Sequence, residues 1–398
     1  MTTTEMAPAD AVAPDTTDEP ALLEWLADMR REHPVWRDRY GMYHVFRQAD
    51  VQTVLRDPAR FSSETSRLAA ASAKVSRGML TQIDPPEHRR LRQVVSTAFT
   101  PKRVADLEPR IREITRRLLD AVPDDGGFDL VDALAFPLPV TVIAEMLGLP
   151  ASDHPLFRTW ADRLFSMQVD DPSDPALGER VAAAMADIVA YLTARVQERR
   201  TAPTEDLISA LVAAGLDDEE AANFSLLLLL AGHITTTVLL GNAVRTFAEH
   251  PGVWEGLRAD PATIPAAIEE VLRLRSPFTM AGRVTTEPVE IAGTTIPADR
   301  FVLVWMLSAN HDERAFDDPE AFVLDRGIGG GAQTAFGHGV HFCLGAPLAR
   351  LEARVALEEL TARYHALSPT SGSMEVLRPY PRGVLGVRRL PVKGVRSY

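Results

Sequence analysis

The sequence predicts a mainly α-helical protein with small β-sheets at one side, folded as a single large domain around a long central helix. Three observations support this fold class. Apolar residues recur at helical spacing along most of the chain. One segment is apolar almost all round for much longer than an ordinary helix. Strand-like alternation is confined to a few short regions.

The composition is ordinary for a soluble globular protein, with 46% hydrophobic and 24% charged residues among 398. A formal net charge of -13 argues against nucleic acid or a membrane as a partner, because both favour a basic surface. One cysteine allows no internal disulfide. Residues 1–20 lack the basic and apolar parts of a signal peptide and are expected to be a disordered tail, followed by a single domain over 21–398. We therefore expect a cytoplasmic protein.

The first half of this domain is predicted to be mostly helical. An amphipathic helix ends at Pro34, and residues 35–47 alternate around Tyr40 and Gly41 as a hairpin does. Further helices are predicted at 49–56, 86–98, 107–118, 138–147, 152–168, 176–199 and 204–213.

The central helix is predicted from its two ends. Asp217 and Glu220 form a capping-box pattern, and Pro251 with Gly252 marks the stop. The helix should cover 218–249, roughly 32 residues and about 48 Å long. Since its middle is apolar almost all round, it must pass through the interior.

Strand signals return at 282–307, with turns at Glu287-Pro288 and Ala292-Gly293. A last helix is expected from about Ala346, and residues 384–392 are expected to form a C-terminal strand. These short strands are the small sheets of the predicted fold.

The only cysteine, Cys343, lies in a glycine-rich loop just before the helix that starts near Ala346. The glycines allow tight turns and close approach, and N–H groups at a helix N-terminus favour a thiolate. The residues leave four interpretations open. They are a small buried core residue, a nucleophile activated by His341, a zinc ligand beside His338 and His341, and the axial thiolate of a haem iron.

The segment AGHITTT, Ala231 to Thr237, lies in the middle of the long helix. Glycine in a helix costs about 1 kcal/mol relative to alanine, and a run of threonines fills a helix poorly. One explanation is close helix packing, with hydroxyls bonded to carbonyls four residues back. The other is that small residues make room for a flat cofactor and O₂. Thr235 can then leave the carbonyl of Ala231 and donate toward bound oxygen.

The spacing around Cys343 resembles the cysteine-ligand loop of the cytochrome P-450 family. The matching residues are Phe336, Gly339, His341, Cys343 and Gly345. The pair Glu270 and Arg273 and the AGHITTT segment precede this loop in the family's order, and the likeness covers essentially the whole chain after the tail. The resemblance implies that Cys343 is the axial ligand of haem b (iron protoporphyrin IX), and that Glu270 and Arg273 are a structural pair.

The same resemblance implies a haem site and an activity. The residues it places against the haem are His88, Arg92, Arg283, His341, Phe336, Gly339 and Gly345. The basic ones would hold the propionates. The implied reaction is monooxygenation, a hydroxylation or epoxidation with O₂ as co-substrate. NADPH would take part only through a ferredoxin and a ferredoxin reductase, because the chain has no flavin or nicotinamide motif.

The resemblance also implies catalytic roles for Ala231, Thr235 and Thr236. One departure from the family pattern is Ile234, which stands where the family usually has an acid. Proton delivery is therefore expected to use a water chain organised by the threonines or by substrate hydroxyls. His233 is a candidate relay, unless it faces away from the haem.

Three stretches, 21–47, 136–150 and 231–246, resemble the macrolide-tailoring enzymes that hydroxylate erythromycin D at C-12. This implies a macrolide or polyketide substrate from an antibiotic pathway. Substrate walls are expected from the segments 63–83, 165–169 and 278–281 and from a C-terminal turn. The individual candidates are Met79, Leu80, Ile234, Met280 and Val384.

A ferredoxin is expected to dock where Arg89, Arg350 and Arg354 lie. Three other functions remain as alternatives. The chain would be a thiolate-ligated haem carrier or gas sensor without turnover, a peroxide-driven peroxygenase, or a helical scaffold without haem.

Overall fold

The structure, a computed structural model, describes residue 14 and residues 17–68, 77–123, 127–165, 177–326, 333–370, 374–377 and 383–396. Its α-helices are α1 (Glu19–Glu32), α2 (Gln48–Arg56), α3 (Glu87–Ser96), α4 (Pro101–Asp106), α5 (Glu108–Asp120), α6 (Pro137–Met146), α7 (His154–Phe165), α8 (Leu177–Thr201), α9 (Leu207–Ala213), α10 (Asp218–Glu249), α11 (Val253–Ala259), α12 (Ile264–Leu274), α13 (Met306–Asn310) and α14 (Ala346–Arg363). Its strands are β1 (Val35–Arg37), β2 (Tyr43–Val45), β3 (Phe61–Ser62), β4 (Gly127–Asp129), β5 (Ala281–Thr285), β6 (Val289–Ile291), β7 (Thr294–Ile296), β8 (Phe301–Val304), β9 (Tyr364–Pro369), β10 (Glu375–Val376), β11 (Val387–Arg389) and β12 (Pro391–Arg396).

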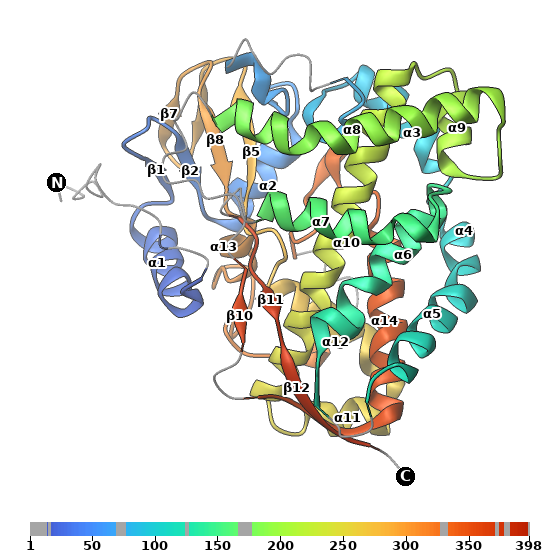
Figure 1. Ribbon diagram of the computed structural model, residues 1–398. Helices are drawn as coiled ribbons and strands as arrows, with labels where there is room; N and C mark the ends of the chain where they lie inside the picture. The colour runs from blue at the N-terminus through green and yellow to red at the C-terminus, as the bar shows by residue number, and fades with distance from the viewer. Residues whose placement is uncertain are drawn as a thin grey trace.

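The fold class is confirmed: helices dominate, and the strands form small sheets beside them (Figure 1). The largest sheet has the order β1-β2-β8-β5-β3 and lies at one side of the helices, next to α1. Its predicted hairpin is present, with Val35 paired to Val45. A second sheet has the order β4-β12-β9, and β6 with β7 and β10 with β11 form two-stranded sheets.

The central helix α10 has the predicted limits. Asp217 and Glu220 form the capping box, because each side chain accepts a hydrogen bond from the other's backbone N–H. The helix packs against α6, α8, α12 and α14 and runs down the middle of the molecule (Figure 1). It is long and apolar enough to cross a membrane by composition alone, but 67% of its most apolar 18-residue window is buried inside the protein. Within the described residues α10 is thus the core of the helical region.

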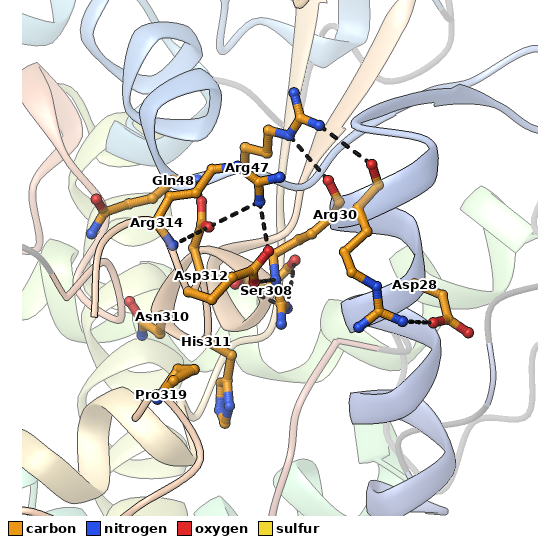
Figure 2. Close-up of polar contacts among 12 residues, drawn as sticks. Asp28, Arg30, Arg47, Gln48, Ser308, Asn310, His311, Asp312, Arg314 and Pro319 are labelled. Carbon is orange, nitrogen blue, oxygen red and sulfur yellow. Dashed lines mark hydrogen bonds and ion pairs between the residues drawn. The ribbon is translucent and has the colours of Figure 1, made fainter. Parts of the chain in front are cut away.

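A polar junction fixes α1 and α2 to α13 and the residues that follow it (Figure 2). Arg30 of α1 is 2% exposed and donates to the carbonyl and hydroxyl oxygens of Ser308 at 3.3 and 3.2 Å. Asp312 accepts from the N–H of Gln48 at 2.8 Å and so caps α2 from a distant part of the chain. Asn310 accepts from the N–H of Thr334 at 2.6 Å, which ties this junction to the start of the cysteine loop.

Some elements were not predicted. The short helices α4 and α13 and the strand β9 are examples. The expected C-terminal strand is also interrupted. Val384 forms only an isolated bridge with Phe278, and the strands β11 and β12, which pair with other strands, begin after it. These elements are too short for their apolar residues to show a helical or strand period. The segment β9 is a strand because it pairs with β12.

Candidate functional site

The loop that carries Cys343 is held by its own backbone. The N–H of Cys343 donates to the carbonyl of Phe336 at 2.9 Å. Gly339 has a φ of 71°, which favours glycine. A Cβ on Gly339 would also lie 2.7 Å from the carbonyl oxygen of Leu55. The close approach expected of these glycines is therefore present, against the end of α2.

The sulfur of Cys343 lies at the N-terminus of α14, as predicted, and accepts the N–H groups of Gly345 and Ala346. Burial nevertheless raises the pKa of the thiol, and these donors and Arg92 offset only part of that effect. The N–H groups at the helix N-terminus do favour the thiolate, as expected, but removal from water outweighs them and the net shift of the pKa is upward. Coordination to a metal cation deprotonates a thiol outright, so this sulfur suits a metal ligand.

The zinc and nucleophile interpretations gain no support from the geometry. Among the described residues, no three His, Cys, Asp or Glu side chains lie close enough together to hold a metal ion. His338 instead accepts from the Nε of Arg56 at 2.5 Å. His341 pairs through Nε2 with the hydroxyl of Ser63 at 2.9 Å, so neither histidine is a base for Cys343.

The structure brings together the basic residues that the sequence resemblance placed against haem. The rings of His88 and His341 are 4.3 Å apart between centroids. His88 is 1% exposed, and within the described part of the chain neither of its ring nitrogens has a hydrogen-bond partner. Burial, followed by the charges of His341 and Arg92, lowers the pKa of His88 to about 4.

Two arginines complete this basic group. Arg92 donates to the carbonyls of Val340 and Phe342 at 2.9 and 2.7 Å, so it holds the cysteine loop. Arg283 is 8% exposed, and the hydrogen bond it makes in the described residues goes to the carbonyl of the adjacent Gly282 at 2.7 Å. Burial lowers the pKa of Arg283 to about 10.

The basic group fits the carboxylates of a haem. A buried cation without an anion and a buried imidazole without a partner both cost free energy unless a ligand satisfies them. Among the described residues Arg283 forms no ion pair and the His88 ring no hydrogen bond, although the charge of Asp84 acts on both. His88 also lies close to Arg92, which acts on the sulfur of Cys343. Propionate groups would supply the missing negative charge and hydrogen-bond acceptors.

One face of α10 is open although the rest of its middle is buried. Ala231 is exposed, and Leu227, Leu230, Ile234 and Thr235 are half-buried. These positions are three or four residues apart, so they share a helix face. The residues around them on α10 are buried, so this face is the part of the helix middle that stays accessible in the structure.

Of the predicted catalytic residues, Ala231 and Thr235 lie on the open face, whereas Thr236 is buried next to Glu352 of α14. The hydroxyl of Thr235 donates to the carbonyl of Ala231 at 3.0 Å, which is the local bond expected for this segment. His233 is 1% exposed, pairs with the carbonyl of Leu229 at 2.5 Å and packs its ring against Phe136. His233 therefore lies away from the open face. This agrees with the alternative considered above, in which His233 is not a proton relay.

Glu352 of α14 is a functional candidate that the sequence analysis missed. It is 1% exposed, and neither carboxyl oxygen has a hydrogen-bond partner among the described residues. Burial raises its pKa to about 8; the neighbouring Thr236 hydroxyl opposes this shift without meeting the geometry of a hydrogen bond. The signal in the sequence is an acid between Leu351 and Val355 on the buried side of an amphipathic helix.

The pair Glu270 and Arg273 has a structural position. Two parallel hydrogen bonds of 2.8 Å join the side chains, which are 4% and 2% exposed. Arg326 also donates to Glu270 at 2.8 Å. Arg273 further donates to the carbonyls of Asn310, Pro319 and Ala321. The pair thus fastens α12 to the segment ahead of the cysteine loop.

The expected substrate contacts are spread over several elements. Ile234 and Met280 are half-buried, and Met79, Leu80 and Val384 are 7%, 6% and 2% exposed. Residues 69–76 and 166–169, where further walls were expected, lie outside the described residues. The described positions leave the substrate roles as predictions.

The three arginines of the expected docking face differ in their surroundings. Arg350 is paired with Glu269 at 2.5 Å, and Arg354 with Glu108 at 2.6 Å. Arg89 of α3 is exposed. Arg89 is therefore the freest of the three to meet a partner's acid.

Comparison with known proteins gives a consistent result. A family model for cytochrome P450 matches residues 22–385. The chain is 58% identical over 385 residues to erythromycin C-12 hydroxylase of Saccharopolyspora erythraea, covering 95% of this chain and 96% of that protein. It is 41% identical over 381 residues to cyclomarin C epoxidase CymV of Salinispora arenicola, covering 94% and 95%.

The fold has a matching solved structure. A mutant of P450 EryK in complex with erythromycin B superposes with a TM-score of 0.92 and 57% sequence identity. The superposition covers 96% of this chain and 98% of that one. The likeness therefore extends over the helical region, the sheets and the cysteine loop together.

Proposed function

This chain belongs to the cytochrome P450 family and is a haem-thiolate monooxygenase, and we propose that it hydroxylates or epoxidises a macrolide or related polyketide of an antibiotic pathway. The observation that carries the substrate class is the 58% identity with erythromycin C-12 hydroxylase over 95% of the chain. The EryK structure with erythromycin B, at a TM-score of 0.92, gives further support. We place the reaction in the cytoplasm, where NADPH-driven redox chains operate.

A binding and turnover experiment tests this proposal. The holoenzyme is titrated with 12-deoxy erythromycins, other macrolides and a steroid of similar volume, and its absorbance is followed. We expect a shift with micromolar affinity for at least one macrolide and, with ferredoxin, reductase and NADPH, a product heavier by one oxygen atom. Binding and oxidation of the steroid with no response to any macrolide would rule out the proposed substrate class.

The residues of the site would hold haem b in defined ways. Cys343 would bind the iron through its sulfur, while Arg92, Arg283, His88 and His341 would hold the propionates. When bound, the haem activates O₂ for insertion of one oxygen atom into the substrate. The protein's contribution is to place the substrate against the open face of α10 and to exclude water from it.

Thr235 is proposed to donate a proton at its hydroxyl oxygen. Its bond to the Ala231 carbonyl fixes the hydroxyl at the open face. We expect Thr235→Ala to lower product formed per NADPH about tenfold or more, the scale of a lost acid–base group, while NADPH consumption stays within about twofold. Thr235→Ser keeps the hydroxyl and should retain most of the coupling. Full coupling in the alanine variant would contradict the role.

Glu352 is proposed to be the proton reserve that the chain uses in place of the acid missing at Ile234. Its carboxyl group lies next to the hydroxyl of Thr236, the residue after Thr235. Its raised pKa keeps this carboxyl group protonated at neutral pH. We expect Glu352→Gln, which keeps the shape but holds no transferable proton, to lower coupling and to enlarge the solvent isotope effect on product formation. An unchanged isotope effect would show that protons reach the site by another route.

Glu352 also predicts a pH dependence of stability. Its pKa is about 8 in the folded chain against 4.5 when exposed, so between these values the unfolded state releases a proton that the folded state keeps. The free energy of unfolding must then fall as pH rises through this window. Urea unfolding at several pH values should show a shallower fall in Glu352→Gln. Parallel profiles for the two proteins would contradict the assigned pKa.

A ferredoxin and its reductase are proposed as the electron donors, with docking at the exposed Arg89. Exposed basic residues steer an acidic partner, and this effect weakens with salt. We expect Arg89→Glu to slow ferredoxin-driven reduction several-fold at low ionic strength. Lys393→Glu, on the distant strand β12, is the control. Equal rates for Arg89→Glu and Lys393→Glu would refute this docking face.

A further inference from the structure

Asp84 joins two segments that supply proposed haem contacts. Its carboxylate accepts from the hydroxyl of Ser62 at 2.5 Å and from the N–H of Ser63 at 2.9 Å, both at the end of β3. Its main-chain carbonyl accepts the N–H of His88 at 2.9 Å at the start of α3. One residue therefore sets the spacing between β3 and the helix that carries His88.

Ser63 extends this connection to the cysteine loop. Its hydroxyl pairs with Nε2 of His341 at 2.9 Å, and the nearer Asp84 oxygen lies 3.9 Å from the same nitrogen. Ser63 is 2% exposed and the His341 side chain 9%, so the contacts are well shielded from water. With Nε2 engaged, Nδ1 of His341 has no hydrogen-bond partner in the described residues and is left for a ligand.

The charge of Asp84 makes this arrangement unexpected. Burial acts to raise the pKa of Asp84, but the nearby His341 and the hydrogen bonds from Ser62 and Ser63 prevail and hold it below its usual range. The negative charge also acts on His88 and Arg283. A carboxylate here repels the propionates that these cations would bind, so Asp84 is not itself a contact for them.

We propose that Asp84 is a positioning residue that holds the His341 ring, through Ser63, in the orientation that binds a haem propionate, and that its charge favours the ferric state. This inference rests on the proposed role of His341. Partners that orient a ligating histidine are commonly worth about 10- to 100-fold in affinity or activity. Asp84 would then retain the haem through geometry while opposing it through charge.

A double-mutant cycle tests the positioning role. The rate of haem transfer from the holoenzyme to excess apomyoglobin is measured for Asp84→Ala, Ser63→Ala, His341→Ala and the double variant Asp84→Ala/His341→Ala. We expect each single change to speed haem loss about tenfold. Asp84→Ala should add less than about twofold in the His341→Ala background, because residues that act through one contact are not additive.

Asp84→Asn separates charge from geometry. The amide oxygen can still accept from the N–H of Ser63, while the amide NH2, in place of the second carboxylate oxygen, can donate to the Ser62 hydroxyl. Haem retention should therefore stay within about twofold of the wild type. Loss of the negative charge should shift the ferric–ferrous equilibrium toward ferrous by up to about tenfold, equal to about 59 mV for one electron. A purely structural role would not move this potential.

The outcomes distinguish the inference from the proposal on which it rests. If His341→Ala leaves haem loss unchanged, the proposed propionate contact fails. If His341→Ala speeds haem loss but the Asp84→Ala effect adds in full, or Asp84→Asn leaves the potential unmoved, the positioning role of Asp84 is overturned. Ser63→Ala, which removes one hydroxyl, repeats the test if Asp84→Ala does not fold.

Discussion

Replacing Cys343 with serine will abolish monooxygenation by this chain. A serine hydroxyl cannot supply the thiolate that a haem-thiolate enzyme needs, and loss of outer-shell partners alone commonly costs about 10- to 100-fold, so we expect a fall of more than about 100-fold. The fold should survive, because the Cys343 N–H bond to Phe336 and the φ of Gly339 do not depend on the sulfur. Mass spectrometry of product made with ferredoxin, reductase and NADPH measures the loss.

His338→Gln is the matched control for this variant. His338 lies in the same loop but is paired with Arg56 and takes no part in the site. It should keep activity within a few-fold of the wild type. A Cys343→Ser enzyme with more than a tenth of wild-type activity would contradict the assignment of the sulfur as the iron ligand.

Arg273→Leu will strongly destabilise the protein. The change leaves Glu270 buried with one fewer cation and removes the donors to the carbonyls of Asn310, Pro319 and Ala321. Breaking a buried ion pair by removing one partner commonly costs about 3–5 kcal/mol. We expect that loss in the free energy of unfolding by urea, together with poor haem incorporation, since the pair supports the segment before the cysteine loop.

Glu269→Gln is the comparison for this second prediction. Glu269 is next to Glu270 on α12, and the change removes its ion pair with Arg350, in which both side chains reach solvent. Such partly exposed pairs contribute about 0–1 kcal/mol. Equal destabilisation by Arg273→Leu and Glu269→Gln would show that burial does not set the importance of the Glu270–Arg273 pair.

The parts of the fold that the sequence predicts are those with local signals. The central helix α10 has a capping box at Asp217 and a Pro-Gly stop, and both of its limits agree with the prediction. The hairpin of β1 and β2 has a glycine turn at Gly41. By contrast, β9 pairs with β12 across a long stretch of chain, so its strand character depends on tertiary contact.

The candidate site divides in the same way. Cys343 was recognisable because its glycine spacing is itself the structural requirement of the loop. The functional interest of Glu352 and Asp84 depends on neighbours far away in sequence: Thr236 on α10 for one, and Ser63 and His341 for the other. Their residue types alone carry no such signal, because most acids on helices and in turns are solvated.

The thiol pKa shows where local reasoning was insufficient. A helix N-terminus lowers a thiol pKa when the sulfur stays in water, and the sequence shows the helix but not the burial. In the fold the burial of Cys343 outweighs the N–H donors of Gly345 and Ala346. The chain alone therefore favours the thiol over the thiolate, and coordination to a metal cation would deprotonate it.

The most direct test of this account is the absorbance spectrum of the purified wild-type protein, reduced with dithionite and exposed to carbon monoxide. We expect a coloured protein whose Soret band moves far to the red, as sulfur ligation by Cys343 requires. A colourless protein, or a band at the position typical of histidine-ligated haem, would contradict the claim that Cys343 holds the iron.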